Sequence, residues 1–162
     1  SAFVRAWHWP EDLSAAVTET VESPVAAVWM VVNTAGVLEE RFDEVEFENV
    51  VEDDFGLVSW TSRHEDRNYY TQFTRTRAEQ PTDGLDWVYA YSIVPDDVPV
   101  LTARLIEMRD LGNGTTEVQI TDELSVKDRQ LRMWMGILGL DSGVKNEMKA
   151  ITSLASAAEA AL

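Results

Sequence analysis

Hydrophobic and polar residues alternate along much of the chain up to residue 126, and such alternation is typical of half-buried β-strands. The segment 15–22 (AAVTETVE) has this pattern with β-branched side chains and predicts the first strand. Six further segments of the same kind follow it. They predict strands over 45–51, 57–63, 69–77, 85–94, 100–109 and 115–126.

The positions between these segments carry turn residues. The clearest turn is Gly112-Asn113-Gly114, because an Asn-Gly pair tolerates the positive φ that a tight hairpin requires. This turn predicts that the last two strands form a hairpin.

Two stretches change to helical spacing. Ser23-Pro24 suits a helix start, since serine caps the first turn and proline has no N–H to leave unpaired there. We therefore expect a short apolar helix over 25–32 and a further helical turn over 37–41. From Lys127 the apolar period predicts a long C-terminal helix over 127–161, in which Asp141-Ser142-Gly143 favours a kink or a break.

The order of these elements predicts an α+β fold, with an antiparallel sheet of about seven strands packed on the terminal helix. A chain of 162 residues is the size of one domain. No repeat or Pro/Gly-rich linker divides it. We expect one domain over 1–162 that begins with an N-terminal extension, 1–13.

Charge and composition exclude several classes of function. The chain has 29 acidic and 13 basic residues, which give a net charge of −16 and a pI of about 4.3. Such a polyanion repels phosphate groups, so neither nucleic acid nor an anionic membrane is an expected partner. No apolar run is long enough to span a bilayer, and we expect a cytoplasmic protein rather than an integral membrane protein.

Bound metals and cofactors are not expected either. The chain has no cysteine, and neither an HExxH motif nor a histidine pair at ligand spacing occurs. No glycine loop leads into a helix in the way that phosphate-binding loops do.

Three stretches follow one another in an order known from other proteins. The strand 17–22 runs into Ser23–Trp29 (SPVAAVW), residues 111–118 (LGNGTTEV) give a glycine hairpin and a strand, and the chain ends in the long helix. Together they resemble the START-like (SRPBCC) superfamily, whose helix-grip fold occurs in polyketide cyclases, pollen-allergen-like proteins and lipid-transfer domains. The resemblance covers roughly residues 15 to 160.

The resemblance implies a curved sheet wrapped around the terminal helix, with two short helices after the first strand. It also implies a cavity between the sheet and the helix that takes a small hydrophobic or aromatic molecule such as a lipid or a polyketide. The superfamily shares no catalytic motif, so the resemblance assigns no catalytic residue.

Aromatic and aliphatic side chains are the candidates for lining such a cavity. Trp87, Tyr89 and Tyr91 alternate and therefore share one face of a strand. Which face points inward is open, because Val88, Ala90 and Ser92 form an equally plausible inner row. Plain core packing is the alternative role for all of these rings. The full set of ligand candidates is Trp60, Phe73, Trp87, Tyr89, Tyr91, Ile106, Val118, Ile120, Trp134, Met135 and Leu138.

Two charged residues are the candidates for catalysis. Asp122 falls in the apolar row of the last strand, and a carboxylate on a buried face must be paired, hydrogen-bonded or protonated. Arg104 shares a row with Ile106, from which it would pair with Asp122 or bind an oxygen of the ligand. The structural alternatives are an aspartate bonded to the first turn of the terminal helix and an exposed arginine. His64, in a charged hairpin segment, would serve as acid or base only at the cavity mouth.

Three functions fit these observations. The first is the binding of a small hydrophobic ligand in the cavity by a monomer or weak homodimer. The second is a cyclase or dehydratase reaction in the same cavity, without metal or cofactor. The third is a protein–protein adaptor of the same fold, which predicts a collapsed cavity and an exposed apolar patch.

Overall fold

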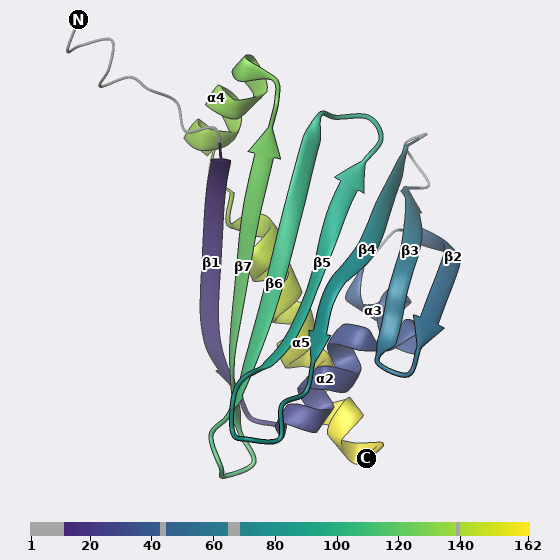
Figure 1. Ribbon diagram of the computed structural model, residues 1–162, viewed down its shortest axis with the longest axis vertical. Helices are drawn as coiled ribbons and strands as arrows, with labels where there is room; N and C mark the ends of the chain where they lie inside the picture. Colours follow the sequence, from purple (N-terminus) through teal and green to yellow (C-terminus); the bar gives the residue numbers. More distant parts are fainter. Residues whose placement is uncertain (1–11, 43–44, 65–68, 139) are drawn as a thin grey trace, which may run out of the picture.

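Seven antiparallel strands form one sheet in the computed structural model, which describes residues 12–42, 45–64, 69–138 and 140–162 (Figure 1). Their order across the sheet is β1-β7-β6-β5-β4-β3-β2. The strands are β1 (Asp12–Val21), β2 (Val45–Asp53), β3 (Gly56–His64), β4 (Tyr70–Glu79), β5 (Trp87–Pro95), β6 (Val100–Asp110) and β7 (Thr116–Val126). The predicted α+β fold with seven strands is confirmed.

Strands β2 to β7 follow one another as a meander, and each pairs with its neighbour in sequence. At the β6–β7 turn, Gly112 and Gly114 have φ of 83° and 80°, a backbone conformation that glycine adopts without steric cost. Strand β1 pairs with β7, so the first and the last strand of the sequence are neighbours in the sheet. The connection from β1 to β2 leaves the sheet and carries the first helices.

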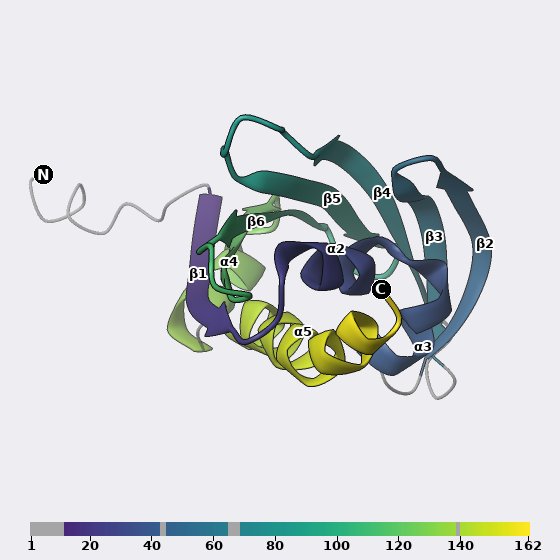
Figure 2. The same ribbon diagram turned by 90° about the horizontal axis from the view of Figure 1, so that it is seen from below.

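The helices are α2 (Val25–Asn33), the 3₁₀ helix η1 (Ala35–Val37), α3 (Leu38–Arg41), α4 (Arg129–Leu138) and α5 (Ser142–Ala160). Figure 2 shows α2 and α5 side by side on the concave side of the curved sheet. None of the helices in the described ranges has both the length and the hydropathy that crossing a bilayer requires.

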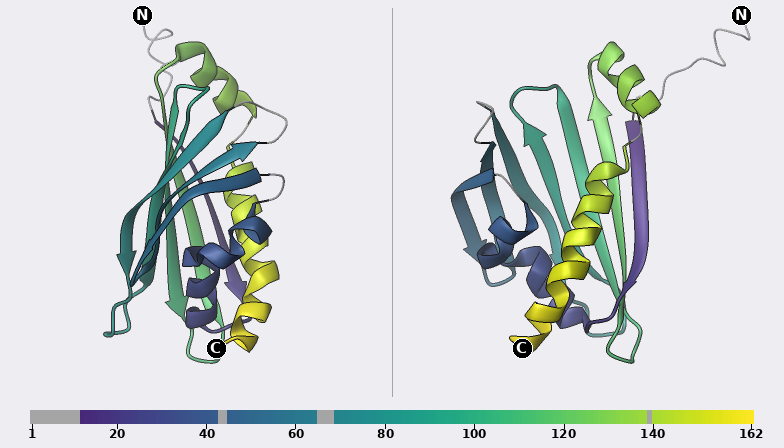
Figure 3. Two further views of the ribbon diagram at one scale, coloured as in Figure 1. Left: turned by 90° about the vertical axis from the view of Figure 1, so that its right-hand side faces the viewer. Right: turned by 180° about the vertical axis from the view of Figure 1, so that it is seen from behind.

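The range 127–161 holds two helices rather than one. Helix α4 lies at one end of the sheet, whereas α5 runs along one face of the sheet (Figure 3). Between them the chain passes through Leu140 and Asp141, where the interruption was expected. Leu131 and Leu140 pack with Leu13 and Leu124 in a small core of their own, so α4 belongs to a separate hydrophobic cluster from α5.

The main core lies between α5 and the concave face of the sheet. Val144, Met148, Ile151 and Ala155 recur at helical spacing on α5, and each is at most 1% exposed. On β5 the row of Trp87, Tyr89 and Tyr91 faces the helices, since Trp29 of α2 meets Trp87 and Tyr89 edge to face at 5.7 and 5.9 Å. This contact settles which face of residues 85–94 points inward.

Candidate functional site

The aromatic side chains of the inner rows pack against one another rather than around an open space. Trp60 of β3 stacks on Phe73 of β4, with ring centroids 4.9 Å apart and planes at 4°. The Trp60 and Tyr91 rings lie 5.4 Å apart, and the Tyr89 hydroxyl donates to the Leu57 carbonyl oxygen at 2.8 Å. Ile106, Val118 and Ile120 are fully buried in the same core.

A chain of buried polar side chains crosses this core, and we call it the buried polar network. Glu147 of α5 accepts hydrogen bonds at Oε1 from Arg41 Nη2 at 2.5 Å and from the Tyr91 hydroxyl at 3.0 Å. Arg104 Nη1 lies 3.4 Å from the Tyr91 hydroxyl oxygen. Arg104 also donates to both carboxylate oxygens of Asp122, at 2.7 and 2.8 Å. The network therefore joins α3, α5 and three strands.

Burial and neighbouring charges oppose each other at Glu147. Burial alone would raise its pKa, but the charges of Arg41 and Arg104 and the hydrogen bonds from Arg41 and Tyr91 outweigh burial, so the pKa lies below its usual value. Burial raises the pKa of Tyr91 to about 12. At neutral pH the network therefore holds a carboxylate at Glu147 and a neutral phenol at Tyr91.

The first turn of α5 covers the Arg104–Asp122 pair. A Cβ added at Gly143 would lie 2.9 Å from Arg104 Nη2 and 3.4 Å from Asp122 Oδ2. Arg104 is 7% exposed and Asp122 is 3% exposed. The structure thus brings the two candidate catalytic residues together in one ion pair, with each side chain satisfying the other. Their catalytic role stays a prediction.

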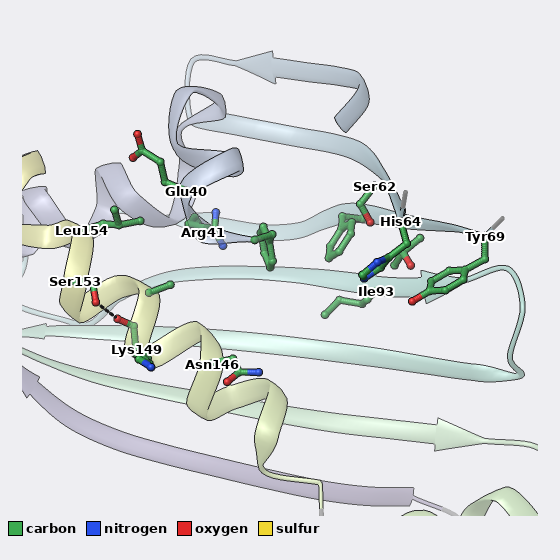
Figure 4. Close-up of a pocket in the computed structure, with 14 residues that line it drawn as sticks. Glu40, Arg41, Ser62, His64, Tyr69, Ile93, Asn146, Lys149, Ser153 and Leu154 are labelled. Carbon is green, nitrogen blue, oxygen red and sulfur yellow. Dashed lines mark hydrogen bonds between the residues drawn. The ribbon is translucent and has the colours of Figure 1, made fainter. Parts of the chain in front are cut away.

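A pocket of about 690 Å³ opens between α5 and the β3–β5 part of the sheet, with the end of α3 at one side (Figure 4). Phe42, Phe73, Ile93 and Leu154 form its apolar lining. Polar side chains complete it, namely Glu40, Ser62, His64, Tyr69, Thr71, Asn146, Lys149 and Ser153. Arg41 lines the pocket as well and thereby joins it to the buried polar network.

The sequence candidates are distributed over several parts of the molecule. Among the ligand candidates, Phe73 lines the pocket, and the other core rings lie behind it. Trp134 is 55% exposed on α4, and Met135 packs in the small core beside Leu13. Leu138 ends α4, but its side chain lies outside the described part of the structure, as do residues 1–11 of the predicted extension.

His64 lines the pocket, and its ring lies 5.5 Å from that of Tyr69. His64 therefore lies at the pocket, as its predicted role as an acid or base requires. The role itself stays a prediction. In the described residues, no group of three or more histidine, aspartate or glutamate side chains is arranged to hold a metal ion.

Sequence reasoning missed Arg41, Glu147 and the α5 side of the pocket. Glu147 carried a signal, because it is an acid within the apolar stripe of Val144, Met148 and Ile151. Arg41 carried none, since it ends the polar tetrapeptide of α3 and is separated from Glu147 by 106 positions.

Comparisons with known proteins bear on the fold. No family model and no curated protein matches the sequence. A norcoclaurine synthase point mutant from Thalictrum flavum, in complex with a transition-state analogue, superposes with a TM-score of 0.67 at 12% identity. The match covers 90% of this chain and 95% of that one.

Two bacterial structures are similar to the same degree. The Zhui aromatase/cyclase from Streptomyces sp. R1128 has a TM-score of 0.66 at 15% identity, over 90% of this chain and 94% of that one. A START superfamily protein from Mycobacterium smegmatis has a TM-score of 0.65 at 10% identity, over 89% and 97%. Likeness at such low identity speaks for the fold and not for the activity. The chain therefore shares the helix-grip fold of these structures, as the sequence resemblance implied.

Proposed function

We propose that the protein binds a small, largely apolar molecule in the pocket between α5 and strands β3–β5. The observation that carries this proposal is the pocket itself, since about 690 Å³ is within the range of small-molecule sites and the lining combines aromatic and aliphatic side chains with a larger number of polar ones. Phe42 and Phe73 offer ring faces to a flat ligand, and their own rings lie 5.8 Å apart.

The similar structures support the same proposal. The Thalictrum flavum norcoclaurine synthase was determined in complex with dopamine and hydroxybenzaldehyde, and the Streptomyces protein is an aromatase/cyclase. Both descriptions concern aromatic or ring-forming chemistry on the helix-grip fold. We infer that a lipid-like or polyketide-like aromatic compound is the class of ligand for this chain.

A cyclase or dehydratase reaction is the alternative in the same pocket. It requires an ionisable group that touches the ligand, and His64 and Lys149 are such groups in the lining. Arg104 and Asp122 satisfy each other beneath Gly143, away from the pocket. Binding needs no such group, and it is therefore the function that the geometry supports best. The adaptor hypothesis is less well supported, since it predicts a collapsed cavity.

Fluorescence titration with N-phenyl-1-naphthylamine, a neutral and flat aromatic dye, tests the proposal. Ala150 lies on α5 and lines the pocket, so Ala150→Phe fills part of the space. We expect this variant to weaken dye binding about tenfold or more, since a bulky ring removes contact area from the ligand. Ala160→Phe places the same ring at an exposed position of α5 and is the matched control. Equal affinity of both variants, or no binding to the wild type, would overturn the proposal.

A further inference from the structure

One carboxylate oxygen in the core, Glu147 Oε2, accepts no hydrogen bond from the described residues. The other oxygen of the same group, Oε1, accepts two, from Arg41 and Tyr91. The Glu147 side chain is 1% exposed, so bulk water does not reach Oε2. A buried and charged oxygen without a donor destabilises a folded protein, and such an atom calls for an explanation.

Two buried donors also lack acceptors among the described residues. Arg41 uses Nη1 on the Val32 carbonyl oxygen at 2.9 Å and Nη2 on Glu147, which leaves Nε unpaired although the side chain is completely buried. The indole Nε1 of Trp60 is also buried and unpaired. Trp60 packs against Tyr91, whose hydroxyl binds Glu147. The interior thus offers one free acceptor and two free donors on side chains that adjoin one another.

These atoms lie directly behind the inner wall of the pocket. Arg41 is part of that wall, and so is Phe73, which stacks on Trp60. On α5, Glu147 shares a stripe with Ala150 and Leu154 at a spacing of three and seven residues, and both of these line the pocket. A ligand in contact with Arg41 and Ala150 therefore lies beside Glu147, since Arg41 binds Glu147 and Ala150 follows it by about one helical turn.

The three unpaired atoms favour some polar groups of a ligand over others. A hydroxyl has one proton to donate and two lone pairs to accept with, which matches one free acceptor and two free donors. A carboxylate has no proton for Glu147. An ammonium would add a positive charge to a network in which the charges of Arg41, Arg104, Glu147 and Asp122 cancel, and an uncompensated buried charge is costly.

We propose that the ligand carries an uncharged hydroxyl group that donates to Glu147 Oε2 and accepts from Arg41 Nε and Trp60 Nε1, while Phe42 and Phe73 hold its apolar body. This inference rests on the proposed function and narrows the ligand to hydroxylated aromatic or alicyclic compounds. Glu147 and Arg41 then act as specificity-determining residues of the pocket.

Two ligands that differ in one group test the inference, namely 2-naphthol and 2-methoxynaphthalene. The methyl ether keeps the ring system and removes the donated proton. We expect wild-type protein at pH 7 to bind the naphthol at least about tenfold more tightly, because the ether leaves Glu147 Oε2 unpaired. Glu147→Gln replaces the acceptor with an amide group and is expected to reduce the preference to about twofold or less. Glu159→Gln makes the same change at an exposed site of α5 and is expected to retain the preference.

A measurement on the unmodified protein covers the case in which Glu147→Gln does not fold. In ¹H–¹⁵N spectra, 2-naphthol is expected to shift the Trp60 indole N–H resonance downfield, whereas 2-methoxynaphthalene is not. Equal affinities of wild-type protein for the two compounds, or an unmoved Trp60 resonance at saturation with naphthol, would overturn the hydroxyl inference and leave the pocket as a binding site. Failure of the neutral dye as well would overturn the proposed function itself.

Discussion

The two ion pairs of the buried polar network differ in how completely their atoms are used. Arg104 and Asp122 meet as a fork, in which Nε and Nη2 each donate to a separate carboxylate oxygen. Arg41 and Glu147 meet end on through a single oxygen, and Arg41 Nε and Glu147 Oε2 have no hydrogen-bond partner in the part of the chain that the structure describes. Both pairs are buried, so the difference does not come from exposure to solvent.

The surroundings of the two pairs explain what each contributes. The Arg104–Asp122 pair lies beneath Gly143, where an added Cβ would come within 2.9 Å of Arg104 Nη2. The Arg41–Glu147 pair adjoins the pocket, and the partner that would complete it can come from there. A buried ion pair with every atom satisfied needs no further partner, whereas one with complementary free atoms can accept another polar group.

Breaking the complete pair should have the largest effect. Asp122→Asn leaves Arg104 as a buried charge without a counter-charge, and we expect the free energy of unfolding to fall by about 3–5 kcal/mol. Urea denaturation followed by circular dichroism measures this loss. Asp86→Asn is the control, since Asp86 pairs with the more exposed Arg109 and should cost less than about 1 kcal/mol. A loss for Asp122→Asn as small as that of the control would show that the pair does not stabilise the fold.

The buried position of Asp122 could be predicted from the sequence, because side chains alternate between the two faces of a strand. In the last strand Val118, Ile120 and Leu124 are apolar, and their neighbours are polar, so Asp122 stands out on the buried side. Its pairing with Arg104, one of the possibilities that the row allowed, follows from the register of β6 and β7, in which the two residues are direct partners.

The same alternation could not predict which face of β5 points inward. Val88 and Ala90 on one side are 6% and 8% exposed, and Tyr89 and Tyr91 on the other are fully buried. With both rows apolar, alternation gives no direction, and the direction is set by contacts with α2 that no local pattern encodes.

The pocket was the least predictable part of the molecule. Its lining comes from α3, β3, β4, β5 and α5, which are distant in sequence, and it depends on where the polar side of α5 meets the ends of three strands. Hydrophobicity identified the side chains that fill the core, and these are mostly not the side chains that line an open pocket. The sequence therefore predicted the fold and allowed the Arg104–Asp122 pair as one of several possibilities, but it did not predict the place of the pocket.

The close packing of α5 on the Arg104–Asp122 pair should give the next largest effect. Gly143→Ala adds a Cβ that would lie 2.9 Å from Arg104 Nη2, and the fork holds this nitrogen in place. Alanine favours a helix over glycine by about 1 kcal/mol, but overpacking costs about 1–3 kcal/mol, so we expect a net destabilisation of about 1 kcal/mol. Gly36→Ala is the control in urea denaturation, since its Cβ would meet its nearest neighbour, Thr34 Cγ2, at 3.9 Å. A stabilised Gly143→Ala protein would show that the Arg104–Asp122 pair shifts to make room for the added Cβ.

The incomplete pair contributes a dependence of stability on pH, which appears on acidification. The pKa of Glu147 is lower in the folded protein than its usual value, because the charges of Arg41 and Arg104 and two hydrogen bonds outweigh its burial. The unfolded chain therefore takes up a proton at a higher pH than the folded chain does. The stabilisation is complete above the usual glutamate pKa and is lost as the pH falls through the folded pKa.

Glu147→Gln removes this titration and isolates its contribution. We expect the free energy of unfolding of the variant to fall less steeply than that of the wild type as the pH is lowered from 6 to 3, measured by urea denaturation at each pH. Glu159→Gln, exposed on the same helix, should follow the wild type. Parallel curves for Glu147→Gln and the wild type would mean that Glu147 is not held as a carboxylate in the folded protein. A protonated Glu147 would itself be a donor, and the free atoms beside the pocket would then call for a different partner than a hydroxyl.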